Sequence, residues 1–221
     1  MSGTVKTVEL ALEHGLAANL AGGTHHAHRS FGSGFTILND LAIAARWAQR
    51  EAGVQRVAII DLDVHQGDGT AAIFTDDPSV FTLSMHCGAN FPFRKAVSDL
   101  DVDVPRGTAD HDYLALLRDT LPGVLEAHAP QLVLYDAGVD PFEGDQLGYL
   151  KLTHAGLLKR DCYVVDTCVS AGIPVACVVG GGYDRDRRAL ARRHALIHRA
   201  CARVWREQKL SAGTRKSKGA N

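Results

Sequence analysis

The chain has 221 residues, 46% of them hydrophobic, so its length and composition predict a single domain with one sizeable core. Its 24 Lys and Arg residues balance 25 Asp and Glu residues, which excludes a strong long-range field for nucleic acid or an anionic membrane. No apolar run approaches the roughly 18 residues of a membrane span, the N-terminus lacks a signal-peptide pattern, and five cysteines without a CxxC pair predict a reduced, cytoplasmic setting.

The first half of the chain alternates between helical and strand patterns. A helix is expected before GGTHHA, and a second helix is predicted over 39–53, with Asn39 or Asp40 as its N-cap. Two β-branched runs follow, at 56–63 and 80–86, and each is apolar on both faces. Runs of this kind are typical of buried parallel strands.

The second half of the chain repeats this alternation. Helical patterns cover 111–130, 153–172 and 184–205. Pro122 is expected to kink or divide the first of these helices. Apolar strands are predicted at 131–138 and 173–182. Strands that alternate with helices in this way predict a single-domain α/β fold, with an open, mostly parallel sheet covered by helices on both faces.

Ionisable residues stand where the predicted strands end, and ligands bind at the carboxyl ends of the strands in sheets of this kind. Asp61, Asp63 and His65 follow the first strand and share one face of an extended segment, because side chains alternate. A carboxylate and an imidazole aimed at one point suit a metal ion. Asp140, after a second strand, offers a third ligand. The sequence therefore predicts a metal site at this edge of the sheet.

Each polar feature also has a simpler interpretation. A DxH sequence after a strand is more often a capped turn than a metal site, and adjacent histidines such as His25 and His26 are often merely solvated. The three glycines before Tyr183 could bring the backbone close to a ligand or could form only a tight turn. These simpler interpretations are independent and would all have to hold at the same sheet edge, so we favour one functional site there.

A series of motifs runs from about residue 15 to residue 205, and it consists of GGTHHA, GSGFTILNDLAIAA, DLDVHQGDGT, NFPFRK, DAGVDPFEGDQLG and GGGY. In this order the motifs resemble the zinc-dependent histone deacetylase superfamily, which has an arginase-like α/β fold. Gln66 stands where many members have a second histidine, and together with NFPFRK this is similar to the class IV branch and its bacterial relatives. Family members begin several dozen residues earlier, so the resemblance implies that a first strand and rim loops of the pocket are absent here.

The resemblance implies a metal-dependent deacylase that uses zinc, with iron(II) as the alternative ion. The implied metal ligands are Asp63, His65 and Asp140. The implied catalytic residues are the paired His25 and His26, the carboxylates Asp61 and Asp68 behind them, and Tyr183, which polarises the substrate carbonyl. A structural potassium site is implied near Asp61 and Ser84.

The chemistry of these residue types agrees with such roles. One imidazole and two carboxylates leave an open coordination position, as in catalytic zinc sites. Hydrolysis needs a base for the attacking water and an acid for the leaving amine, and we assign both to His26, oriented by Asp68. His25, backed by Asp61, is then the electrostatic partner, and Tyr183 donates a hydrogen bond to the developing oxyanion. The expected substrate is an N-acyl primary amine, either acyl-lysine in a protein or an acylated small amine.

Aromatic residues are expected to wall a narrow tunnel for the aliphatic chain of the substrate. Phe35 and one of Phe91 and Phe93 would form its walls, with Gly181 and Gly182 also lining it. A role in the hydrophobic core is an equally good interpretation of each phenylalanine.

Two other functions remain open. Asp61, Asp63, His65 and Asp68 could serve the two manganese ions of an arginase-like hydrolase, or the chain could be a truncated, catalytically weak module that binds acyl-lysine. The catalytic domain is expected to cover residues 1–207, followed by a basic, disordered tail at 208–221. No direct contact with nucleic acid or a membrane is expected.

Overall fold

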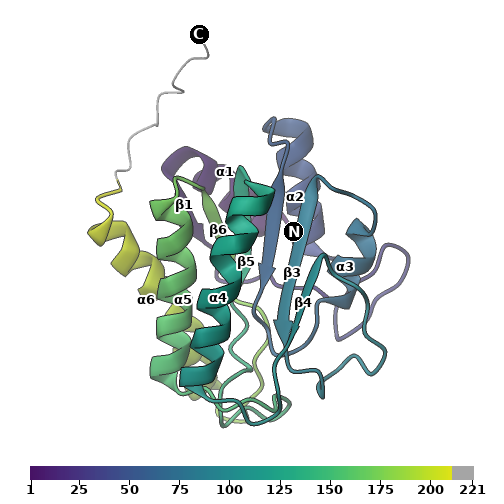
Figure 1. The fold of residues 1–221 in the computed structure, drawn as a ribbon, viewed down its shortest axis with the longest axis vertical. Coiled ribbons are helices and arrows are strands. Elements are labelled where there is room, and N and C mark those ends of the chain that lie inside the picture. Colours follow the sequence, from purple (N-terminus) through teal and green to yellow (C-terminus); the bar gives the residue numbers. More distant parts are fainter. Residues whose placement is uncertain (211–221) are drawn as a thin grey trace.

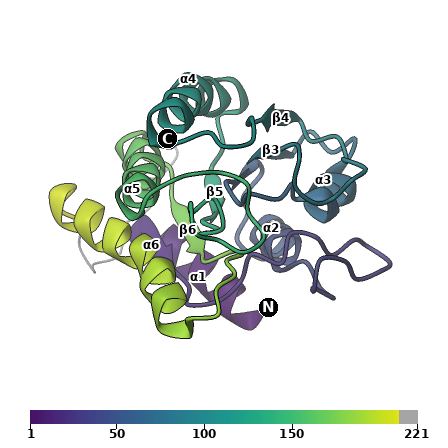
Figure 2. The same cartoon turned by 90° about the horizontal axis from the view of Figure 1, so that it is seen from below.

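A central sheet separates two layers of helices (Figure 1; Figure 2). The structure, a computed structural model, describes residues 1–210, so most of the predicted basic tail, residues 211–221, lies outside the described residues. The predicted α/β fold with helices on both faces of the sheet is confirmed.

Within residues 1–210 the sheet has six strands in the order β1-β6-β5-β2-β3-β4, and every pair of neighbours is parallel. The strands are β1 (Leu16–Ala18), β2 (Val57–Asp61), β3 (Val80–His86), β4 (Leu100–Asp103), β5 (Leu132–Asp136) and β6 (Val175–Val178). The four predicted strands correspond to β2, β3, β5 and β6, with ends that differ by a few residues. The pattern misses both edge strands, because β1 is too short for a pattern and β4 alternates between half-buried and exposed residues.

The helices divide between the two faces of the sheet. Figure 2, seen along the strands, shows α1 (Ser2–His14) and α2 (Asp40–Glu51) on one face and α4 (Asp110–His128) and α5 (His154–Ser170) on the other. The last helix, α6 (Arg187–Glu207), packs against α5 and joins the same core. A short helix, α3 (Asp68–Phe74), contacts β3. Its start overlaps the DLDVHQGDGT motif, which explains why the helical pattern is not visible in the sequence.

The hydrophobic core has two parts, one on each face of the sheet, because successive side chains of a strand point to opposite faces. In β2, Ile59 packs with the helices α1 and α2, whereas Ile60, which points the other way, packs with α4, α5 and α6. In β5, Leu134 packs in the same part of the core as Ile59, and Tyr135 packs in the same part as Ile60. Buried apolar side chains on both faces account for the uninterrupted hydrophobic runs of the strand sequences.

Two local predictions have opposite outcomes. Asn39 caps α2, as predicted, because its side chain accepts a hydrogen bond from the backbone N–H of Ala42 at 2.9 Å. Of the two predicted effects of Pro122, division of the helix is wrong, since α4 is continuous from Asp110 to His128, and a kink stays a prediction. Leu121 and Val124 on either side of the proline are buried, and this packing offsets the missing backbone hydrogen bond.

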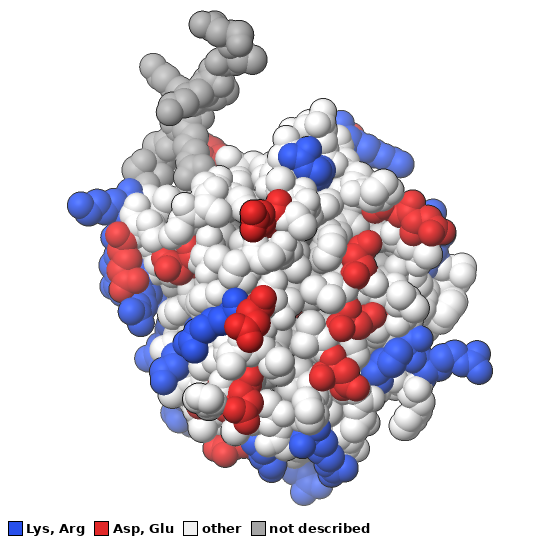
Figure 3. Space-filling view, viewed as in Figure 1, with Lys and Arg blue, Asp and Glu red and all other residues white. Residues whose placement is uncertain are grey.

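The loops that follow the strands gather at the lower end of Figure 1, toward which the strand arrows point. This edge carries the polar residues considered below. On the face drawn in Figure 3, acidic and basic side chains are interspersed, in agreement with the balanced charge of the sequence. Across residues 1–210, no helix has both the length and the apolar character needed to cross a membrane.

Candidate metal centre

Asp63, His65 and Asp140 meet at the carboxyl edge of the sheet, where β2 and β5 are neighbours. His65 Nδ1 lies 3.0 Å from Asp63 Oδ1 and 3.1 Å from Asp140 Oδ2. All three residues are buried. One ring nitrogen and one oxygen of each carboxylate therefore point at a common position.

The second oxygens of both carboxylates are held by the backbone. The N–H of Gly181 donates to Asp63 Oδ2 at 2.8 Å, and the N–H of Val64 donates to Asp140 Oδ1 at 2.8 Å. These bonds fix the planes of the carboxylates and leave Asp63 Oδ1 and Asp140 Oδ2 facing the His65 ring, and the backbone N–H of His65 also donates to Asp63 Oδ1 at 3.0 Å. One imidazole and two carboxylates are a donor set that suits zinc or iron(II) and leaves a coordination position for a small ligand.

Electrostatics at this group favours a cation. Burial and the charge of Asp63 raise the pKa of Asp140 to about 7, because two carboxylates share a space with little water. Burial opposes charge on His65, yet hydrogen bonds to Asp140 and Asp63 raise the pKa of this imidazole to about 10. The group therefore attracts positive charge, and a metal ion would replace the proton on His65.

The adjacent histidines come from the loop after β1, and each is paired with its own carboxylate. His25 Nδ1 lies 2.6 Å from Asp61 Oδ2, and His26 Nδ1 lies 2.6 Å from Asp68 Oδ1. The ring centroids of the two histidines are 4.1 Å apart. In both residues Nδ1 is taken by a carboxylate, which leaves Nε2 for other partners.

The pKa values of the two imidazoles are shifted in opposite directions. Burial disfavours charge on His25, but the nearby carboxylates, Asp61 first among them, raise the pKa of this imidazole well above its usual value. Burial and the charge of His25 lower the pKa of His26. Near neutral pH the pair therefore combines a charged His25 with a neutral His26.

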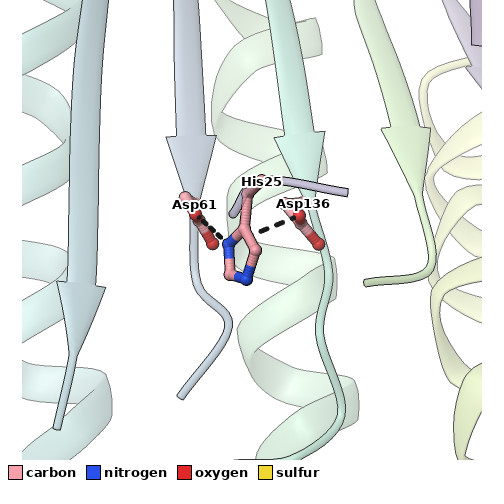
Figure 4. Close-up of side chains that lie close together, drawn as sticks. All are labelled: His25, Asp61 and Asp136. Carbon is pink, nitrogen blue, oxygen red and sulfur yellow. Dashed lines mark hydrogen bonds and ion pairs between the residues drawn. The ribbon is translucent and has the colours of Figure 1, made fainter. Parts of the chain in front are cut away.

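Asp136 is a buried carboxylate that the sequence analysis misses. It is the register partner of Asp61 on the neighbouring strand, and Figure 4 shows His25 between the two. The His25 Nδ1 to Asp136 Oδ2 distance is 4.0 Å, and neither oxygen of Asp136 has a hydrogen-bond partner among the described residues. Burial and the charge of Asp61 raise the pKa of Asp136 well above its usual value. The sequence signal that could have identified Asp136 is its position as the last residue of a buried strand.

Two groups within the described residues could each hold a cation. One is Asp63, His65 and Asp140, and the other is His25, Asp61 and Asp136. Asp68 belongs to neither group, because its oxygens face imidazoles in the loop after β1. The dinuclear set suggested by the sequence, which included Asp68, is therefore not assembled as expected.

A pocket of about 410 Å³ opens beside the metal-binding group. Its lining consists of His26, Gly34, Phe35, His65, Ala89, Asn90, Phe91, Phe93, Leu147, Tyr149 and Tyr183. The Phe91 ring packs edge-on against His26, with ring centroids 5.0 Å apart. The ring centroids of Phe35 and Tyr183 are 6.2 Å apart. Phe35 and Phe93 are 88% and 97% exposed, so these two rings stand at the mouth of the pocket and are not part of the core.

Gly181 and Gly182 do not line this pocket. A Cβ atom at Gly181 would lie 2.5 Å from Asp140 Oδ2 and 2.6 Å from Asp63 Oδ2, which places this glycine behind the carboxylates. Gly182 has a φ of 157° and packs against Val139. Gly181 therefore allows the metal-binding carboxylates to approach the backbone, and neither glycine forms a wall of the pocket.

Tyr183 faces the metal-binding group from the loop after β6. Its ring lies 6.1 Å from the His65 ring and nearly perpendicular to it. The N–H of Tyr183 donates to Asp145 Oδ2 at 2.7 Å, and the same carboxylate accepts from Leu147 and Gly148. Burial and the charge of Asp63 raise the pKa of the Tyr183 phenol, so its hydroxyl remains a hydrogen-bond donor.

Asp61 and Ser84, expected near a potassium ion, are register partners on β2 and β3. Both oxygens of Asp61 already have partners, since Oδ1 accepts from the N–H of Asp63 and Oδ2 faces His25. The Ser84 hydroxyl lies 3.0 Å from His86 Nδ1. The two residues are thus neighbours, and the potassium ion remains a prediction.

Comparison with known proteins gives consistent matches. Residues 1–199 match the family model described as "Histone deacetylase domain". The chain is 56% identical to an uncharacterized protein of Picosynechococcus sp. over 93% of this chain and 68% of that protein. It is 36% identical to histone deacetylase 2 of Arabidopsis thaliana over 83% of this chain and 48% of that protein. The chain therefore spans about half the length of the plant relative.

Solved structures give the same result. A crystal structure of a histone deacetylase homolog complexed with SAHA matches with a TM-score of 0.76 and 31% identity. The match covers 91% of this chain and 55% of that one.

Proposed function

This chain belongs to the histone deacetylase family, and on that premise we propose that it is a zinc-dependent amidohydrolase that removes the acyl group from acyl-lysine. The observation that carries this proposal is the convergence of Asp63, His65 and Asp140 beside a pocket lined by His26 and Tyr183. Family membership and fold support a deacetylase function, and the metal and the substrate are our proposals.

Asp63, His65 and Asp140 would hold the ion. Bound zinc supplies a Lewis acid for the amide carbonyl and lowers the pKa of a coordinated water toward 7. The fit rests on two features of these residues, namely that all three ligand atoms point at one position and that the opposite carboxylate oxygens are held by backbone N–H groups.

His26 is the proposed general base and, after the amide has been attacked, the general acid. Its ring lines the pocket, its Nδ1 is occupied by Asp68, and its lowered pKa keeps Nε2 free to accept a proton near neutral pH. His25 is the proposed electrostatic partner, because its raised pKa supplies a fixed positive charge 4.1 Å from the His26 ring. Because their protonation states differ, the two adjacent imidazoles can serve different catalytic roles.

Tyr183 is the proposed donor to the oxyanion. Its side chain lines the pocket beside His65, and its phenol keeps its proton because its pKa is raised. Removal of a single oxyanion donor typically costs about 3 kcal/mol of transition-state stabilisation. Asp145 acts indirectly, since its carboxylate holds the backbone of Tyr183 in place.

The lining of the pocket favours a neutral aliphatic chain, and therefore acyl-lysine rather than an acylated polyamine. Phe35, Phe91 and Leu147 supply apolar surface, and none of the described lining residues is a carboxylate. Arg106 lies over the Tyr149 ring, 4.2 Å from its centroid, at the edge of this lining. A polyamine carries further positive charges, which would meet an arginine and no acidic partner.

A substrate panel on zinc-loaded protein tests the proposal. Acetyl-lysine and longer acyl-lysine peptides should be hydrolysed with a higher kcat/KM than N-acetylspermidine. Faster turnover of the polyamine would overturn the substrate assignment and keep the amidohydrolase. Activity that requires two manganese ions per chain would instead favour an arginase-like hydrolase, in which the second group of His25, Asp61 and Asp136 holds an ion.

A further inference from the structure

The Asp68 carboxylate lies between two imidazoles. Its Oδ1 atom is 2.6 Å from His26 Nδ1, and its Oδ2 atom is 3.2 Å from His28 Nε2. Asp68 is the first residue of α3 and is buried. Each oxygen therefore faces one ring, and the proposed base, His26, shares its carboxylate with a second histidine.

The surroundings of His28 hold its ring in this position. The ring stacks on Phe31, with centroids 4.2 Å apart and an angle of 17° between the planes. The N–H of His28 donates to the carbonyl oxygen of Phe31 at 3.0 Å, which closes the turn that carries both residues. The His28 side chain is 18% exposed, whereas Phe31 is 58% exposed and covers it. A stacked ring on a closed turn has little freedom to point Nε2 elsewhere.

We infer that His28 is a positioning residue for the reaction, because it fixes the Asp68 carboxylate that orients His26. This inference rests on the proposed function, in which His26 transfers protons. A carboxylate bonded through one oxygen can rotate about its Cβ–Cγ bond, whereas a second donor on the other oxygen fixes its plane. The second hydrogen bond also withdraws negative charge from Asp68, so that His26 is oriented without being strongly drawn into its charged form.

The ionisation state of Asp68 is consistent with a carboxylate that accepts hydrogen bonds from both His26 and His28. Burial favours the neutral acid, but hydrogen bonds from His26 first and then from His28 lower the pKa of this carboxyl. Asp68 is therefore ionised near neutral pH and accepts on both oxygens. The two histidines lie on different sides of it, since His26 lines the substrate pocket and His28 lines a separate groove beside α2.

A set of matched variants separates positioning from support of the loop. His28→Phe keeps a ring for the stack on Phe31 and removes the donor to Asp68. His28→Gln keeps a donor and removes the ring. Phe31→Leu removes the stack and keeps the donor. In zinc-loaded protein, His28→Phe should lose about tenfold in kcat on an acetyl-lysine peptide, the effect of losing one hydrogen bond to a charged group. KM and zinc content should stay close to the wild-type values, and His28→Gln should recover most of kcat.

A second measurement does not depend on turnover. In zinc-loaded protein labelled with ¹⁵N-histidine, nuclear magnetic resonance should show His28 with its proton on Nε2 and His26 with its proton on Nδ1. The Nδ1–H signal of His26 should broaden through faster exchange in His28→Phe and stay sharp in His28→Gln. If the wild-type protein hydrolyses no acyl-lysine, the proposed function fails and these signals still test the role of His28.

Two results would overturn the inference. In the first, kcat and the His26 signal are unchanged in His28→Phe, which would mean that Asp68 orients His26 unaided. In the second, Phe31→Leu loses as much kcat as His28→Phe while the His26 signal stays sharp, which would mean that His28 only supports its loop. Should His28→Phe fail to fold, His28→Leu, which also lacks the donor to Asp68, takes its place in the comparison with His28→Gln and Phe31→Leu.

Discussion

Replacement of Gly181 by alanine should weaken the metal centre without changing any ligand. A Cβ atom at this position would lie 2.5 Å from Asp140 Oδ2 and 2.6 Å from Asp63 Oδ2, and real Cβ contacts do not fall below 3.0 Å. The nearer oxygen would have to move by about half an ångström, because 3.0 minus 2.5 is 0.5. Metal–ligand distances tolerate only about 0.2 Å. The displacement of two carboxylates should weaken zinc binding by about 10- to 100-fold, the range seen when the supports of metal ligands are removed.

A helix of the same protein provides the matched control. Gly123 lies in α4, and a Cβ atom there would meet nothing within 4 Å. Gly123→Ala should keep the wild-type affinity for zinc and add up to about 1 kcal/mol of stability, because alanine favours helix more than glycine does.

Competition with a chromogenic chelator measures zinc affinity in both variants, and thermal unfolding of the metal-free proteins shows whether each is folded. A folded Gly181→Ala variant that binds zinc as tightly as the wild-type protein would contradict this prediction. That result would mean that Asp63 and Asp140 are not the ligands or that their carboxylates can move freely.

Four further predictions concern the ligands and the catalytic groups. Tyr183→Phe should lose about a hundredfold or more in kcat while its zinc content and Tm stay unchanged, and a variant with full turnover would leave Tyr183 as a packing residue. His26→Ala should be slower than His25→Ala in single-turnover assays, and the reverse order would exchange the two proposed roles. Asp140→Ala should bind zinc weakly in equilibrium dialysis, and an unchanged affinity would remove Asp140 from the site. Because the raised pKa of His65, about 10, keeps it protonated near pH 7 and zinc needs the neutral ring, the apparent zinc affinity should rise with pH by up to about tenfold per unit. Calorimetry in buffers of different ionisation enthalpy should detect this released proton, and binding without proton release would contradict the assignment.

The sequence predicts those parts of the fold and site that depend on local pattern. Strands β2, β3, β5 and β6 are short, β-branched and apolar on both faces, a pattern typical of buried parallel strands. The pairing of Asp63 with His65 follows from alternation along an extended segment, and Asp140 follows from the rule that the ends of parallel strands share one edge.

The remaining features depend on contacts between distant parts of the chain. Asp136 lies 4.0 Å from His25 although more than a hundred residues separate them in the sequence, and the register of β2 and β5 places Asp136 beside Asp61, the carboxylate that pairs with His25. The contact of His28 with Asp68 likewise joins residues 40 positions apart. The role of Gly181 could not be predicted, since a glycine beside a pocket and a glycine behind a carboxylate look the same in a sequence.

The central claim is that Asp63, His65 and Asp140 hold one zinc ion that serves amide hydrolysis. Its most direct test is acetate release from an acetyl-lysine peptide, measured while metal-free protein is titrated with zinc and, in parallel, while Asp140→Ala is titrated. We predict that acetate release by the wild-type chain rises with zinc, saturates at one ion per chain and is absent in the variant across the same range. Saturation of the wild-type chain with one zinc ion and no release of acetate would contradict the account.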